Sequence, residues 1–195
     1  MWVVLTYCII IFLLNFYHNE LYHSKVLRKA YLFLYTLVEY TTFTYLLFFN
    51  IASRKVRSLI LIVSCLFTVF LVFFNFVITY RRFDSIPTGA ETLLLLVFSI
   101  YFFYEQFKNS STFYIYHHYC FWFTIGILIY LSGSFFIYVF ADQLNSAELN
   151  EFWTFTYIVE IIKNIFFTIG LLIYARKPFA KPPKMDLPYL DFKES

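Results

Sequence analysis

The stretch LILIVSCLFTVFLVFFNFVITY at residues 59–80 decides the fold class of this chain. It holds no Asp, Glu, Lys or Arg, and basic residues flank it on both sides, among them Arg57 and Arg81. A helix needs about 20 mostly apolar residues to cross the hydrocarbon core of a bilayer. Strands of an outer-membrane barrel would instead alternate apolar and polar residues. The stretch therefore predicts a transmembrane helix.

Similar apolar runs lie on both sides of this stretch, and together they predict an all-α fold. The predicted spans are residues 1–17, 30–51, 59–80, 88–107, 119–141 and 152–175. All five prolines lie outside these runs, as unbroken helices require. Pro87 and Gly89 are expected to form a turn just before the fourth span. We expect a polytopic transmembrane helix bundle of about six helices over residues 1–175, followed by a short polar cytoplasmic tail, residues 176–195.

Composition supports a membrane protein and argues against several other classes. The chain has 195 residues, 61% of them hydrophobic and 14% charged, whereas soluble domains carry about 25% charged residues. A net charge of +3 without a basic run does not indicate nucleic-acid binding. The cysteines Cys8, Cys65 and Cys120 are scattered through apolar runs, which argues against a disulfide framework or a thiolate metal site. We expect the lipid bilayer as the main partner, with no cofactor and no metal.

The first run stands where a signal peptide would stand. It has no basic segment at its start, and Asn15 to His18 do not form a small-residue cleavage site. We expect it to be retained as a helix, with a cleaved leader as the alternative.

The distribution of Lys and Arg predicts the orientation, because cytoplasmic loops of membrane proteins are enriched in both. With a cytoplasmic C-terminus the inner segments carry Arg54, Lys55, Arg57, Lys108, Arg176, Lys177, Lys181 and Lys184. The outer loops then carry the smaller set of Lys25, Arg28, Lys29, Arg81 and Arg82. Both termini are therefore predicted to be cytoplasmic, in the inner (cytoplasmic) membrane.

A few ionisable or polar residues lie at membrane depth, where a charge costs about 2.5–3.5 kcal/mol on insertion scales. Glu39 lies near the middle of the second span, and Glu91 near the outer end of the fourth. Glu160, Lys163 and Asn164 lie in the sixth span at a spacing that predicts one helical face. We expect these five residues to line or brace a polar core.

Two interpretations of this polar core remain open. Lys163 could form an interhelical ion pair with Glu39 or Glu160 that fixes which helices face each other. Alternatively, the residues form a polar pocket open to the outer side that receives a ligand or carries protons. Three acids against one base also require a protonated carboxyl, an arginine from a loop or a bound cation.

Two further patterns have mainly structural interpretations. Gly126 and Gly133 are seven residues apart, so they share a helix face and allow a neighbouring helix to come close. His117 and His118 lie in an aromatic stretch typical of a membrane interface, and we expect no metal there. The chain contains no H-E-x-x-H, no G-x-S-x-G and no Gly-rich phosphate loop, so we do not expect an enzyme.

Several short segments resemble one group of membrane proteins. They are Val38–Tyr40, Glu91–Leu96, Phe121–Trp122 with Gly126–Gly133, and Ile161–Ile165. Over about residues 30–175 the chain resembles uncharacterised multi-span proteins that are widespread in Bacteroidota. They usually have seven helices, and some are associated with sensor histidine kinases. Against that pattern we expect the first of the seven helices to be missing here, which leaves open a misplaced start or a genuinely shorter protein. The resemblance implies a membrane protein with a histidine kinase as a possible partner, and it supplies no catalytic residues.

These observations favour a non-enzymatic membrane module that senses or transmits a signal through a cytoplasmic partner. One alternative is an oligomeric channel- or pore-forming effector, for example in defence. A small transporter is a further alternative, and a homo-oligomer is compatible with each.

Overall fold

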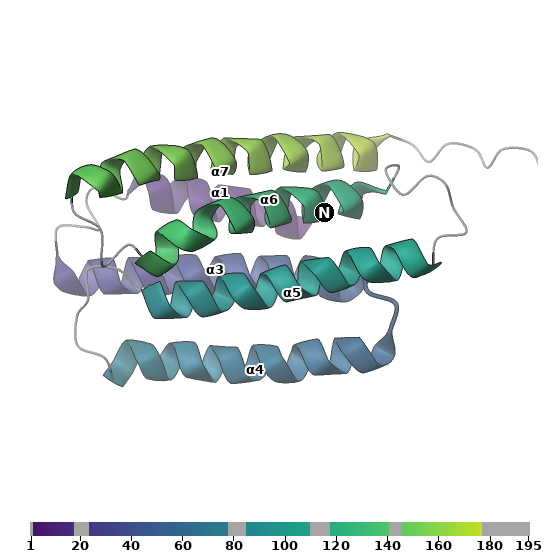
Figure 1. The fold of residues 1–195 in the computed structure, drawn as a ribbon, viewed down its shortest axis with the longest axis horizontal. Coiled ribbons are helices and arrows are strands. Elements are labelled where there is room, and N and C mark those ends of the chain that lie inside the picture. Colours follow the sequence, from purple (N-terminus) through teal and green to yellow (C-terminus); the bar gives the residue numbers. More distant parts are fainter. Residues whose placement is uncertain (1, 18–23, 78–84, 110–117, 141–145, 177–195) are drawn as a thin grey trace, which may run out of the picture.

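A computed structural model of the chain describes residues 2–17, 24–77, 85–109, 118–140 and 146–176 (Figure 1). Every element in these ranges is an α-helix, and each overlaps one of the predicted runs. The helices are α1 (Trp2–Phe16), α3 (Lys25–Asn50), α4 (Arg54–Val77), α5 (Ser85–Asn109), α6 (Tyr119–Phe140) and α7 (Ser146–Ala175). The predicted all-α helix bundle is confirmed.

Four of these helices, α3, α4, α5 and α7, are long and apolar enough to cross a membrane. The apolar parts of α1 and α6, Trp2–Phe16 and Tyr119–Phe135, are shorter. The 15 residues of α1 extend about 22 Å at 1.5 Å per residue, less than the roughly 30 Å of a hydrocarbon core. Most of the predicted tail, from residue 177 on, lies outside the described residues.

The expected turn at Pro87 and Gly89 is wrong. The structure places both residues in the first two turns of α5, which begins at Ser85. Proline is tolerated in the first turn of a helix, because its missing N–H would have no intrahelical partner there. A proline close to a glycine therefore marks the beginning of the helix here, not a turn before it.

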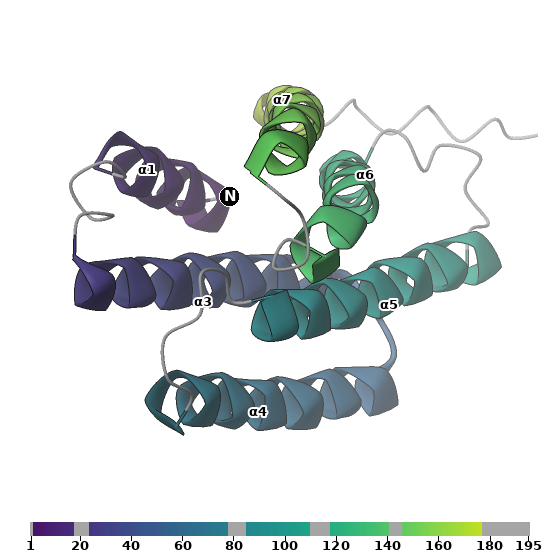
Figure 2. The same ribbon diagram turned by 60° about the vertical axis from the view of Figure 1, so that its left-hand side comes forward.

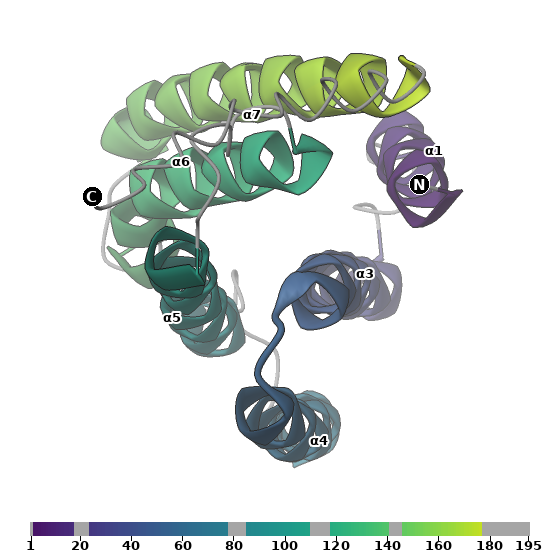
Figure 3. The same cartoon turned by 90° about the vertical axis from the view of Figure 1, so that its right-hand side faces the viewer.

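Helices that follow each other in the sequence run in opposite directions (Figures 1 and 2). In Figure 3, α3 lies near the middle, α4 at one edge and α7 at the opposite edge. α4 packs against α3 and α5, whereas α7 packs mainly along α6, and α1 contacts α3. The N-terminus of α1 and the C-terminal end of α7 point toward the same end of the bundle (Figure 1).

Glycine allows the close packing of α6 against α7. A Cβ atom added at Gly133 would lie 2.7 Å from Cγ1 of Val159, and one at Gly126 would lie 3.0 Å from Cβ of Phe166. Real Cβ atoms almost never show the shorter distance, so the two helices could not approach as closely with alanine there. The packing role predicted for Gly126 and Gly133 is confirmed.

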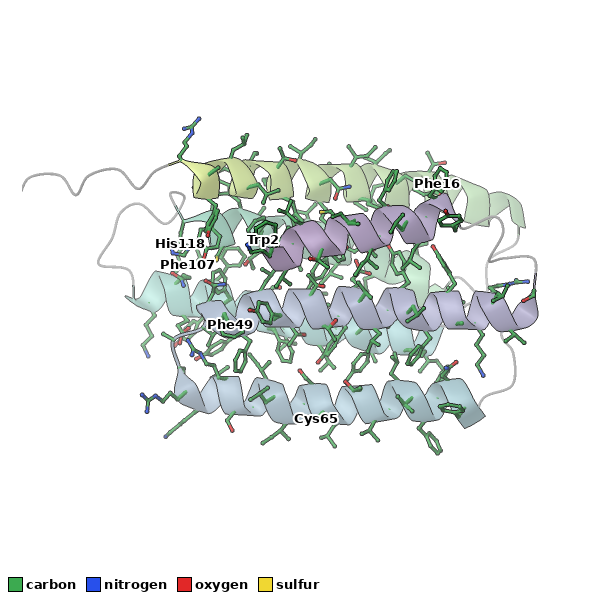
Figure 4. The ribbon with its side chains drawn as sticks, turned by 180° about the vertical axis from the view of Figure 1, so that it is seen from behind. Trp2, Phe16, Phe49, Cys65, Phe107 and His118 are labelled. Atoms are coloured by element: carbon green, nitrogen blue, oxygen red, sulfur yellow. The ribbon has the colours of Figure 1, made fainter. Side chains whose placement is uncertain are left out.

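Apolar residues cover the outside of the bundle, while charged groups lie within it. On α4 the exposed large apolar residues are Leu59, Leu61, Ile62, Leu66, Val69, Phe70, Val72, Phe73 and Phe76. Figure 4 shows side chains projecting from the outer edge of α4, where Cys65 lies. In contrast, Glu39, Glu91, Glu105 and Lys163 are buried. In water such a surface would be unfavourable, whereas lipid solvates it, and intramembrane charges face the bundle interior.

Candidate functional site

Lys163 of α7 is the centre of the polar core. Its side chain is completely shielded from solvent, an exceptional position for a lysine. Its Nζ atom lies 3.9 Å from Oε1 of Glu39 and 3.9 Å from Oε1 of Glu160. Both distances are too long for hydrogen bonds, so the two carboxylates attract the ammonium group through charge. Glu39 is equally buried, whereas the side chain of Glu160 is 21% exposed.

Tyr7 of α1 links the lysine to Glu39 by hydrogen bonds. Nζ of Lys163 donates to the Tyr7 hydroxyl oxygen at 3.0 Å, and the Tyr7 hydroxyl donates to Oε1 of Glu39 at 3.3 Å. The hydroxyl is therefore acceptor and donor at once, and the three side chains form a continuous hydrogen-bonded chain across α7, α1 and α3.

Tyr130 of α6 completes the surroundings of the lysine. Nζ of Lys163 lies 4.0 Å from the centre of the Tyr130 ring, which is a cation–π contact. The Tyr130 hydroxyl donates to Oε2 of Glu39 at 3.4 Å. Both oxygens of Glu39 therefore accept hydrogen bonds. We call Lys163, Glu39, Glu160, Tyr7 and Tyr130 the Lys163 cluster.

Aromatic rings close around the Lys163 cluster. Phe43 and Phe167 lie 5.3 Å and 6.3 Å from the Tyr7 ring between centroids, and Phe123 lies 5.3 Å from Phe167. These rings exclude water, so charges attract each other more strongly than at a wet surface. The same exclusion makes an unpaired charge costly, because it would have neither water nor a counter-charge.

The five predicted core residues lie in three different surroundings. Glu39, Glu160 and Lys163 come together as described. Glu91 of α5 is buried, and its Oε1 atom has no hydrogen-bond partner within the described residues. Asn164 is exposed on the outer face of α7. It is one residue, about 100°, around the helix from Lys163, so it does not face the lysine, although it follows Glu160 by one helical turn.

Sequence reasoning missed Tyr7 and Tyr130, and no local signal distinguishes them. The chain has 18 tyrosines, and only the folded bundle shows which of them face Lys163.

Glu105 was also missed, although an acid in the last turns of an apolar span is itself a signal. Its carboxylate accepts hydrogen bonds from the backbone N–H groups of Ala52 at 2.7 Å and Ser53 at 2.9 Å. These residues immediately precede α4, where free N–H groups and the helix dipole favour a negative charge. The Glu105 side chain of α5 thus binds the connection between α3 and α4.

The described residues contain no group of three or more His, Cys, Asp or Glu side chains arranged to hold a metal ion. His118 stacks on Tyr119 with 5.0 Å between ring centroids. It lies at the same end of the bundle as Phe49 and Phe107 (Figure 4), in keeping with an interfacial aromatic belt. His117, His18 and His23 lie outside the described residues.

The Lys163 cluster can therefore hold charge, pass a proton along hydrogen bonds and couple four helices, α1, α3, α6 and α7. Comparisons with protein-family models, with curated proteins and with solved structures found no match to the chain.

Proposed function

We propose that this chain is a non-enzymatic protein of the cytoplasmic membrane that transmits a signal from the outer side to a cytoplasmic partner. The observation that carries the proposal is the joining of α1, α3, α6 and α7 around the buried ammonium group of Lys163. Both termini are proposed to be cytoplasmic, following the Lys and Arg distribution of the loops.

A buried charge shared by several helices is suited to switching. Breaking one contact of a buried ion pair costs about 3–5 kcal/mol, so the cluster cannot lose a contact without other contacts rearranging. A ligand or proton that changes the charge on Glu160 or Glu39 would therefore shift the balance between helix arrangements. α7 carries Lys163 and extends to Ala175, so a displacement of α7 would reach the proposed cytoplasmic end.

The resemblance to proteins associated with sensor histidine kinases suggests the partner. A histidine kinase at the cytoplasmic face would bind the helix ends and respond to their displacement. The basic side chains at that end include Arg54, Arg57 and Lys108, which would face acidic surfaces of the partner.

A small proton-coupled transporter is the second candidate. It is favoured by the line of ionisable groups from the partly exposed Glu160 through Lys163 and Tyr7 to Glu39. An oligomeric pore is less compatible with the structure, because aromatic rings fill the space around Lys163 and a pore would have to form between copies.

Flux measurements separate these functions. Purified protein in liposomes loaded with a pH-sensitive and an ion-sensitive dye is expected to leave the membranes tight to protons and to small ions. Proton uptake that disappears in Glu160→Gln would favour the transporter, and ion leakage would favour the pore. Either result would contradict the proposed function.

Coupling can be measured directly with spin labels near the C-terminal ends of α3 and α7, in lipid nanodiscs. Neutralising Glu160 by Glu160→Gln is expected to change the distance distribution between the labels. Ser132→Ala is a matched control, since the Ser132 hydroxyl only bonds the carbonyl of Leu128 in its own helix. Identical distributions in the wild type and Glu160→Gln would contradict signal transmission through the cluster.

A further inference from the structure

Asn164 is a polar side chain on the outside of α7 at the depth of the bilayer centre. It lies in the membrane-spanning segment Thr154–Ala175, about 15 Å from either end at 1.5 Å per residue. Long Lys and Arg side chains can reach the headgroups from within a bilayer, but the short asparagine side chain cannot. Its carboxamide therefore stays in hydrocarbon unless another protein chain covers it.

Within the described residues the Asn164 carboxamide has no hydrogen-bond partner. Only the backbone carbonyl of Asn164 is used, by the Thr168 hydroxyl at 2.8 Å. The hydroxyls of Thr168 and Ser132, also on exposed parts of the spans, differ in this respect, because both bond to carbonyls of their own helix. An amide with two N–H donors and one acceptor in lipid is unfavourable, so Asn164 indicates an uncovered interface.

The residues around Asn164 form a seam suited to a second helix. Exposed Tyr157, Ile161, Asn164 and Thr168, followed by the half-buried Leu171, are spaced by four, three, four and three residues. This is the spacing of residues that face a partner helix at a small left-handed crossing angle. α7 lies at the edge of the bundle in two perpendicular views (Figures 1 and 3), so the seam is open along its length.

We propose that this seam of α7 binds a second copy of the chain, with the two Asn164 carboxamides hydrogen-bonded to each other. Every copy inserts with the same orientation, so Asn164 of two copies lies at the same depth. A two-fold axis along the membrane normal then brings equivalent residues together. A carboxamide is self-complementary, since its N–H donor matches the oxygen acceptor of its counterpart. The inference does not depend on the proposed function.

The test measures dimerisation in lipid bilayers, by single-molecule counting of labelled protein at increasing dilution in lipid. The wild type is expected to dimerise, and Asn164→Leu is expected to weaken dimerisation by about tenfold, the order found for interhelical hydrogen bonds. Asn164→Gln keeps the amide and is expected to keep the dimer. Ser132→Leu, which removes a polar group already bonded within its own helix, is expected to change nothing.

Cysteine cross-linking gives a second measurement that does not rely on removing the amide. In a Cys65→Ser background, Thr168→Cys and Ile161→Cys are expected to form disulfide-linked dimers on mild oxidation. In the wild type, which keeps Cys65 exposed on α4 at the opposite edge, no disulfide-linked dimer through Cys65 is expected. A monomeric wild type, equal dimerisation in Asn164→Leu, or cross-linking through Cys65 in place of α7 would each overturn the proposal.

Discussion

At the scale of single residues, the charge on Lys163 is balanced by acids that stand at different levels of exposure. Glu39 is buried with hydrogen bonds to both oxygens, whereas Glu160 reaches the surface. Glu39 is therefore the better shielded counter-charge, and the side chain of Glu160 is the one that reaches the outside of the bundle. Under the proposed function, Glu160 is the member whose charge a signal would alter.

The pairing of Lys163 with Glu39 predicts strong coupling between two substitutions. Lys163→Met leaves Glu39 buried without its counter-charge and is expected to cost about 3–5 kcal/mol. Glu39→Gln leaves the lysine paired with the partly exposed Glu160, so a smaller loss is expected. The double variant Lys163→Met with Glu39→Gln is expected to be more stable than Lys163→Met alone, because no charge then remains at the fully buried position of Glu39. Chemical unfolding in lipid or detergent measures this, and additive losses would contradict the pairing.

Tyr7 and Tyr130 both contact Lys163, but their hydroxyl groups contribute differently. Tyr7→Phe removes the link that accepts from the lysine and donates to Glu39, with an expected loss of about 1.5–3 kcal/mol for hydrogen bonds to charged groups. Tyr130→Phe keeps the cation–π contact and loses one long hydrogen bond, so a smaller loss is expected. Chemical unfolding ranks the two variants by their free energy of unfolding. A larger loss of stability for Tyr130→Phe would contradict the hydrogen-bonded series from Lys163 through Tyr7 to Glu39.

The sequence predicted Glu39, Glu160 and Lys163 as neighbours because charges at membrane depth are rare and need partners. It placed Asn164 in the same core, because Asn164 follows Glu160 by four residues, whereas the structure exposes this side chain. Tyr7 and Tyr130 were hidden among many similar aromatic residues. Contacts between distant helices, not local pattern, select such residues.

At the scale of elements, the close packing of α6 against α7 depends on glycines, which have no side chain, as well as on the side chains that face them. Gly133 faces Val159, and Gly170 of α7 faces Phe123 of α6, where an added Cβ atom would lie 2.8 Å from the ring. Glycines therefore stand on both helices of the pair. The spacing of Gly126 and Gly133 was sufficient to predict packing, but the identity of the facing helix required the structure.

Gly133→Ala is expected to destabilise the bundle by about 1–3 kcal/mol, the usual cost of overpacking, because the new methyl group collides with Val159. Val159→Ala in the same chain removes the colliding methyl groups and is expected to recover part of the loss. Thermal unfolding of the single and double variants tests this. If Val159→Ala adds its own loss without recovery, the steric explanation fails.

At the scale of the whole molecule, the apolar outer surface and the buried charged groups are those of a fold suited to a lipid environment. The apolar runs predicted the helices well, since about 20 consecutive apolar residues have few alternatives to a membrane helix. The helix ends were less predictable: α3 begins at Lys25 and α5 at Ser85, both before the apolar runs start. Polar residues can extend a helix beyond the hydrocarbon, where composition no longer marks its limit.

The proposed orientation predicts which positions a membrane-impermeant thiol reagent reaches in intact cells. In a chain whose native cysteines are replaced by serine, Lys29→Cys is expected to react from outside. Arg54→Cys and Lys108→Cys are expected to react only after the membrane is opened. The opposite pattern would show that the topology is inverted, and labelling of all three positions in intact cells would contradict a single orientation.

The contact of Glu105 with Ala52 and Ser53 has a consequence for how the chain is made. Synthesis releases the connection between α3 and α4 roughly fifty residues before it releases Glu105, at about 5–20 residues per second. During that interval the two N–H groups have no carboxylate partner, and the α3–α4 hairpin must wait in the membrane for α5. The arrival of α5 then locks three helices at one end, so this half of the bundle can be completed before α6 and α7 enter.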